Sequence, residues 1–137
     1  MRIGSILENQ KIEKRIAVTP EIVKKYTSLG FEILLSKNYG SHLGIKDEYY
    51  KELGVKIIND ESEVINSSDI IVQIGMLSDD KSSNIKENQI LIGVLNPYDN
   101  KEKLQRLAKK KINLFSLELL PRITRAQSMD ILSSQAN

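Results

Sequence analysis

Short apolar runs alternate with amphipathic stretches along the chain, and turn signals separate them. The clearest helix begins at Thr19-Pro20-Glu21, which combines a threonine N-cap, a proline in the first turn and an acidic residue. We predict that this helix ends at Gly30, because glycine adopts the left-handed conformation of helix ends without strain. Its inward stripe is expected to be Ile22, Val23, Tyr26 and Leu29.

The same alternation predicts the remaining elements. The runs 69–74 and 89–95 are apolar enough for strands that are buried on both faces of a sheet. A basic amphipathic helix is expected over 101–110, with Leu104, Leu107 and Ala108 facing inward. Further strands are expected over 2–7, 31–35, 55–58 and 112–117, a short helix over 47–53, and a polar loop over 8–18. This order predicts an α/β fold with three layers, a mostly parallel sheet with helices on both faces, of the Rossmann or flavodoxin kind.

Composition narrows the class of protein. A length of 137 residues, 40% of them hydrophobic and 28% charged, suits one globular domain over residues 1–137. The absence of cysteine excludes disulfides, thiolate catalysis and thiolate-bound metals. A net charge of +2 is too small for a nucleic-acid-binding domain. Since no apolar run reaches the about 18 residues that a membrane span needs, we also expect no direct membrane insertion.

Ligands of open α/β sheets bind beyond the carboxyl ends of the strands, so the loops that follow the strands are where a site is expected. The richest is 120–130, which offers two guanidinium groups, a carboxamide and a carboxylate. These groups suit a polar, phosphate-bearing ligand. However, Thr124 and Gln127 also have the spacing of a capping box, in which Gln127 would only cap a final helix. Spacing alone leaves both roles open.

Other candidate residues point to structure rather than chemistry. His42, the only histidine, has no acid beside it and fits a surface residue. Asp79 and Asp80 follow a strand, where carboxylates can bind Mg²⁺, but the residues after them favour the start of a helix. Neither a glycine-rich dinucleotide fingerprint nor a Walker A motif occurs in the sequence.

Two segments resemble a known family. Glu13-Lys-Arg-Ile-Ala-Val-Thr-Pro20, with Gly-Phe at 30–31, resembles the opening of the N-terminal domain of alanine dehydrogenases and NAD(P) transhydrogenases. The tail PRITRAQSMDILSSQAN, residues 121–137, is similar to the alpha subunit of proton-translocating NAD(P) transhydrogenases. The resemblance spans essentially the whole chain.

The resemblance implies a division of labour between domains. In such enzymes, one domain binds NAD(H) and passes hydride directly to NADP(H) on a partner domain, coupled to proton movement through a membrane domain. Residues 1–137 match only the first α/β half of the NAD(H) domain, without the Rossmann half that has the glycine fingerprint. We therefore expect a truncated fragment of an oxidoreductase and translocase, inactive alone and dimeric in the whole enzyme. It would lie peripherally on the cytoplasmic or matrix-like side of an energy-transducing membrane.

The resemblance also assigns residues to the cofactor. Arg122 would meet the ribose–phosphate portion of NAD(H), and Gln127 and Ser133 the nicotinamide with its ribose. Asp130 would hold the loop and the ribose hydroxyls. Arg15, which faces the substrate carboxylate in alanine dehydrogenases, would either contact the ligand here or support the nearby loops. No catalytic acid or base and no metal are expected, because hydride passes directly between two nicotinamides.

Two alternatives stay open. An alanine dehydrogenase-like, NAD-dependent oxidoreductase would have a lysine after the strand 69–74 and a histidine after the strand 89–95, where this chain has Gly75 and Asn96. The second alternative is a non-catalytic α/β binding module. A receiver-type module would need acidic residues that 4–7 and 73–75 do not supply.

Overall fold

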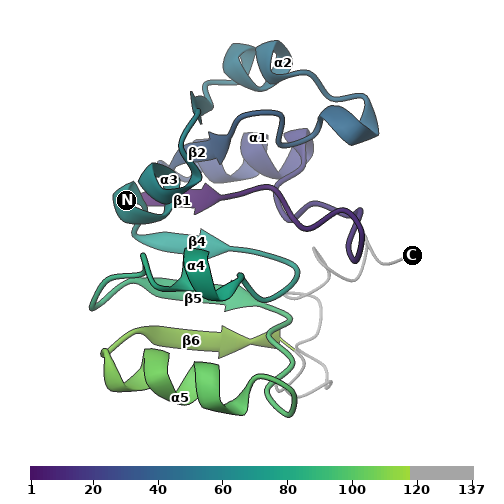
Figure 1. Ribbon diagram of the computed structural model, residues 1–137. Coiled ribbons are helices and arrows are strands. Elements are labelled where there is room, and N and C mark those ends of the chain that lie inside the picture. The colour runs from purple at the N-terminus through teal and green to yellow at the C-terminus, as the bar shows by residue number, and fades with distance from the viewer. Residues whose placement is uncertain (118–137) are drawn as a thin grey trace, which may run out of the picture.

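An open sheet of six parallel strands, in the order β3-β2-β1-β4-β5-β6, organises the computed structural model, which describes residues 1–117 (Figure 1). The strands are β1 (Arg2–Ser5), β2 (Glu32–Ser36), β3 (Lys56–Ile58), β4 (Ile70–Val72), β5 (Ile90–Gly93) and β6 (Asn113–Ser116). The helices are α1 (Pro20–Ser28), η1 (Ser41–Leu43, a 3-10 turn), α2 (Asp47–Glu52), α3 (Glu61–Ser67), α4 (Asp79–Ser82) and α5 (Lys101–Lys109).

Local signals set most of these boundaries. The Thr19 side chain accepts a hydrogen bond from the N–H of Ile22, and Gly30 has a φ of 93°, so both ends of α1 are as predicted. Asp79 begins α4 after the N-cap Ser78, which confirms the expectation of a helix there. A further helix of seven residues, α3, which Asp60 caps, was not predicted from the sequence.

Two cores lie on opposite faces of the sheet and make the fold three-layered. One core joins β1, β2 and β4 to α1, to α2 and to residues 16–18. The other joins the opposite side of the strands to α3, to α5 and to Leu77 and Ile85, which lie on either side of α4. In Figure 1, α3, α4 and α5 lie in front of the sheet and α1 lies behind it. The predicted fold class is therefore confirmed, with a sheet that is entirely parallel.

Two predicted core positions are wrong. Leu29 is 72% exposed because α1 ends at Ser28 and Leu29 is its C-cap. Ala108 is exposed because the buried stripe of α5 is narrow and centres on Leu107, with Leu104 half-buried beside it. None of the described helices is long and apolar enough to cross a membrane.

Candidate functional site

The carboxyl ends of β1 and β4 lie side by side at the point where the chain leaves the sheet in opposite directions. From β1 it proceeds through α1 to β2, and from β4 through α4 to β5. Open α/β sheets bind ligands at such a switch point. In Figure 1 the strands point to the right, and the loop after β1 extends beyond them on that side. A hollow of about 310 Å³, which we call the crevice, opens here. It is lined by Ile6, Leu7, Glu8, Asn9, Glu61, Gln73, Met76, Leu77, Ser78 and Lys81.

Glu8 places a buried carboxylate in the wall of this hollow. Only 8% of the residue is exposed. One carboxylate oxygen accepts from the N–H of Ile74 (2.8 Å) and from the side chain of Gln73 (2.9 Å), and the other accepts from the N–H of Gly75 (3.1 Å). Burial raises the pKa of Glu8, although the two backbone donors act in the opposite direction. The carboxylate thus ties the chain after β1 to the end of β4.

Gln73 continues the pairing of β1 with β4 beyond their last backbone partners. Its carboxamide oxygen accepts from the N–H of Ile6 (2.7 Å) and from the Ser5 hydroxyl (2.9 Å). Its amide group donates to the carbonyl of Ile6 (3.1 Å) and to Glu8. The side chain therefore replaces strand hydrogen bonds at the place where the two chains diverge.

Tyr39 anchors the other end of the loop 8–18. Its fully buried hydroxyl accepts from the N–H groups of Ala17 and Val18, both at 3.1 Å, and lies 2.8 Å from the Ser5 hydroxyl. Because Tyr39 accepts twice, its own hydrogen goes to Ser5, whose hydrogen in turn goes to Gln73 or to the carbonyl of Val72. Burial raises the pKa of Tyr39 well above its ordinary value. A continuous buried network thus runs from residues 17–18 to Glu8.

The expectation of a polar loop over 8–18 is correct only for its first part. Ile16, Ala17 and Val18 are at most 1% exposed and belong to the core beside α1. The alternating charges of the preceding residues obscured this short apolar run in the sequence. As a result, the loop is held at both ends while its tip faces outward.

Arg15 lies on this loop and is exposed. Burial raises the pKa of Glu8, and the positive charge of Arg15 opposes this rise without reversing it. Its guanidinium donates to both carboxylate oxygens of Glu13 at 2.8 Å, and the backbone N–H of Arg15 donates to the same carboxylate. This bidentate pair lowers the pKa of Glu13 and fixes the orientation of the guanidinium. The other predicted cofactor residues, Arg122, Gln127, Asp130 and Ser133, lie outside the described residues.

Gly75 and Asn96, where the resemblance implies a lysine and a histidine in alanine dehydrogenases, lie at the same edge of the sheet. Gly75 follows β4 and donates its N–H to Glu8. Asn96 follows β5 in a left-handed conformation with φ 49°, and its side chain donates to Asp99 (2.8 Å). Both residues thus have local structural roles.

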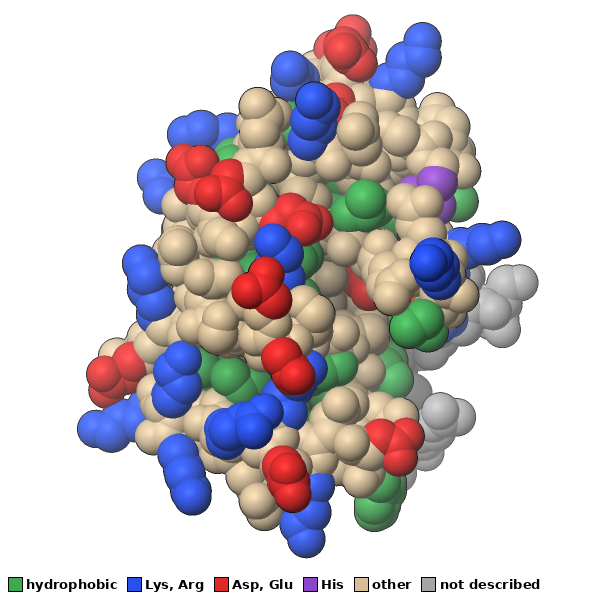
Figure 2. All heavy atoms as spheres, viewed as in Figure 1, with side chains coloured by type: hydrophobic (Ala, Val, Ile, Leu, Met, Phe, Trp, Pro, Cys, Tyr) green, Lys and Arg blue, Asp and Glu red, His purple; other side chains and the backbone are tan. Residues whose placement is uncertain are grey.

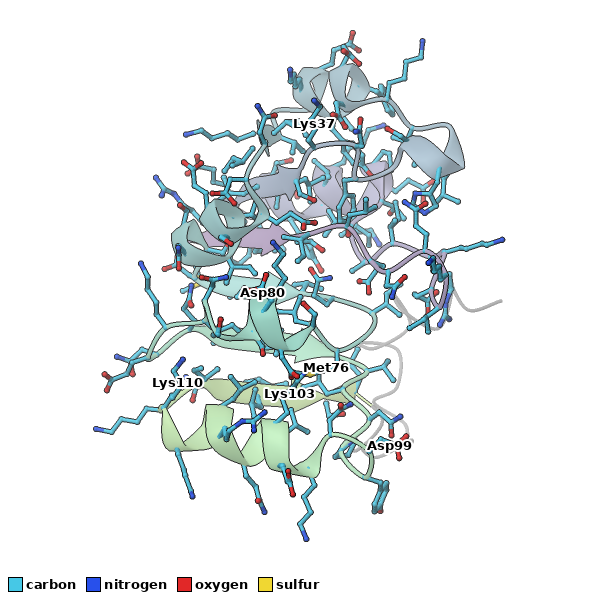
Figure 3. The ribbon with its side chains drawn as sticks, viewed as in Figure 1. Lys37, Met76, Asp80, Asp99, Lys103 and Lys110 are labelled. Carbon is cyan, nitrogen blue, oxygen red and sulfur yellow. The ribbon has the colours of Figure 1, made fainter. Side chains whose placement is uncertain are left out.

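The weaker candidates take up structural contacts. The His42 ring lies 2.7 Å from the carbonyl of Lys14, so it supports the loop. Asp79 pairs with Lys103 (3.0 Å), which lowers the pKa of Asp79, and Lys103 also donates to the carbonyl of Leu77. Figure 3 shows Lys103 reaching from α5 toward the segment that contains Met76. Among residues 1–117, no cluster of three or more metal-ligating side chains occurs.

Residues 5–137 match the family described as "Alanine dehydrogenase/PNT, N-terminal domain". The chain belongs to this family. The match confirms the resemblance seen in the sequence. The crevice at the carboxyl ends of β1 and β4 therefore lies in a domain of the kind that alanine dehydrogenases and PNT proteins have at their N-terminus.

Relatives within the family point to its transhydrogenase branch. The chain is 39% identical over its whole length to the first part of the NAD(P) transhydrogenase alpha subunit of Rickettsia prowazekii, and 37% identical to its counterpart in Rhodospirillum rubrum. It covers 37% of each of these relatives. Identity to "Alanine dehydrogenase 1" of Staphylococcus aureus is 26%, over 99% of the chain and 36% of that protein.

Solved structures agree with this assignment. The transhydrogenase from Sinorhizobium meliloti superposes with a TM-score of 0.89 and 33% identity, covering 99% of this chain and 40% of that one. An L-alanine dehydrogenase shares the fold, with a TM-score of 0.78 and 18% identity over 85% of this chain and 32% of its own. The chain is thus a transhydrogenase-type domain that spans little more than a third of its relatives.

Proposed function

We propose that this chain forms part of the NAD(H)-side domain of an NAD(P) transhydrogenase. Hydride passes directly between NADH and NADP⁺ in this proposal, coupled to proton translocation through the rest of the enzyme. The observation that carries it is the 37–39% identity, over the whole chain, to transhydrogenase alpha subunits. Because the chain covers 37% of those relatives, the remainder of the NAD(H) domain, the NADP(H)-binding domain, the membrane domain and a second copy of the subunit are proposed partners.

The described residues fit one wall of a dinucleotide site. They provide an open crevice at the carboxyl ends of β1 and β4, and the exposed guanidinium of Arg15 belongs to the loop that follows β1. A pyrophosphate is usually held by a glycine-rich turn and the free N–H groups of a following helix. Here Thr19 already caps the start of α1, and Pro20 has no N–H. We therefore assign the pyrophosphate to the remainder of the NAD(H) domain, and the nicotinamide end to this crevice together with Arg122, Gln127, Asp130 and Ser133.

Bound NADH itself supplies the hydride, so the protein contributes orientation and exclusion of water. In the proposal, the network of Glu8, Gln73 and Tyr39 keeps the crevice wall fixed, and the Glu13–Arg15 pair presents one guanidinium toward the ligand. None of these groups has to gain or lose a proton during transfer. This agrees with a site that binds and aligns without an acid or a base.

The alternative is oxidation of an amino acid, as in alanine dehydrogenases. Arg15 favours it, because the family resemblance gives that arginine a substrate carboxylate as partner. Gly75 and Asn96 count against it, since neither side chain can replace the lysine and histidine that the same resemblance implies there.

The deciding experiment uses the complete subunit that contains this chain, mixed with its NADP(H)-binding partner. We expect NADPH to form from NADH and NADP⁺ only when both subunits are present. We expect no NADH to form from L-alanine and NAD⁺. Alanine-dependent formation of NADH would overturn the proposal. Gln127→Asn tests the assigned site, because a variant that retains the parental transfer rate but loses helix stability would show that Gln127 is only a cap.

A further inference from the structure

The loop 8–18 exposes one large apolar side chain, that of Ile12, to solvent. Ile12 is 83% exposed, although it lies in a loop whose last three residues are fully buried. Leu43 in η1 is 49% exposed, and η1 packs on the same loop through His42. We call the surface formed by Lys11, Ile12, Lys14, His42 and Leu43 the Ile12 tip. In Figure 2 the purple histidine, with blue and green side chains, lies at the right-hand edge of the molecule.

The Ile12 tip is held in place before any partner arrives. The N–H groups of Ile12 and Glu13 donate to the carbonyl of Asn9, at 2.9 and 2.8 Å. The His42 ring contacts the carbonyl of Lys14 (2.7 Å) and the side chain of Gln10 (3.3 Å). Binding through such a surface orders little additional chain, so little of the contact energy is lost to ordering.

The charge around Ile12 is positive. Lys11 and Lys14 are exposed, and neither forms an ion pair within residues 1–117. The one acidic residue between them, Glu13, is already neutralised by Arg15. An exposed, preordered isoleucine flanked by lysines is complementary to an acidic surface with an apolar centre.

We propose that the Ile12 tip docks an acidic face of the subunit that holds NADP(H). The inference rests on the proposed function, which requires a second nucleotide-binding subunit to approach the carboxyl edge of this sheet. The tip lies on that edge, beside the crevice, because it belongs to the loop that directly follows β1. Docking there brings the partner to the side on which the nicotinamide is expected, while Ile12 supplies apolar contact and the lysines guide the approach.

The test measures the affinity between the complete subunit containing this chain and the NADP(H)-binding subunit by calorimetry, independently of hydride transfer. We expect Ile12→Ser to weaken the complex at least tenfold. Lys14→Glu should weaken the complex several-fold and reduce the dependence of its affinity on salt. Leu29→Ser and Lys109→Glu are the matched controls, because Leu29 is similarly exposed and Lys109 lies at the other end of the sheet, and they should leave the affinity unchanged.

Each outcome separates the two proposals. Weaker binding of Ile12→Ser without hydride transfer in the parent would support the docking surface and refute the proposed function. Equal affinities of the Ile12→Ser and Leu29→Ser variants, or no complex with the unsubstituted subunit, would overturn the docking surface. So would a loss of self-association in Ile12→Ser with unchanged binding of the partner, since the occupant would then be a second copy.

Discussion

Tyr39→Phe is the most informative single change in the buried network, because it removes one oxygen and leaves the ring in place. That oxygen is the acceptor for the N–H of Val18, a residue with 0% exposure, and the donor to the Ser5 hydroxyl. A buried donor left without an acceptor costs about 1–3 kcal/mol, and the broken bond to Ser5 adds to this. We expect the free energy of unfolding to fall by about 3 kcal/mol.

Two other tyrosines provide graded controls. Tyr50 donates a single hydrogen bond to the carbonyl of Val18 (2.8 Å), so Tyr50→Phe should cost about 1 kcal/mol. Tyr98 is 90% exposed, and Tyr98→Phe should change stability by less than about 0.5 kcal/mol. Urea unfolding of the three variants measures the order directly. Hydrogen exchange at Ala17 and Val18 should accelerate in Tyr39→Phe alone. A Tyr39→Phe variant as stable as Tyr98→Phe would refute the reasoning that this network holds the loop.

Three further predictions concern the same edge of the sheet. Burial raises the pKa of Glu8 above its ordinary value of 4.5, so the stability that the protonated side chain contributes is present below pH 4.5 and is lost as the pH rises through the pKa of the folded state. A ¹³C titration of the Glu8 carboxyl group should therefore show a midpoint above 4.5, and a lower midpoint would contradict this. Gly93→Ala should destabilise the chain by about 3 kcal/mol in urea unfolding, because the added Cβ would lie 2.4 Å from the carbonyl oxygen of Gln73. Gly75→Ala should cost far less, because its Cβ would lie 3.4 Å from the nearest atom, a carboxylate oxygen of Glu8. Calorimetry of residues 1–137 with NADH should detect no binding, and a micromolar dissociation constant would refute the assignment of the pyrophosphate to the remainder of the domain.

The sequence predicted the elements of the fold wherever the signal was local. The cap at Thr19, the turn at Gly30 and the apolar runs of β4 and β5 each depend on neighbouring residues, and each was located to within a few positions. The predictions were wrong or incomplete where the residues next to a position in the sequence do not determine its structure. Leu29 fits the helical period but follows the last turn of α1, and α3 is too short and polar to show a clear stripe.

The site was predictable in place but not in composition. The strand order puts loops 8–18 and 75–80 at one edge, as expected for an open α/β sheet. Glu8, Gln73 and Tyr39 were not identified, because their partners are 21 to 68 residues away in the sequence and no short motif joins them. One signal was available: a glutamate and a glutamine stand just after two apolar strands that a Rossmann order makes neighbours.

The most direct test of the central claim is a label-transfer measurement with the complete enzyme. NADH carrying deuterium at the transferable C4 position is mixed with NADP⁺, and the NADPH formed is analysed by mass spectrometry. Direct transfer between nicotinamides predicts that the deuterium appears on NADPH and not in water. NADPH without deuterium, or no NADPH at all from an enzyme that binds both nucleotides, would contradict the account.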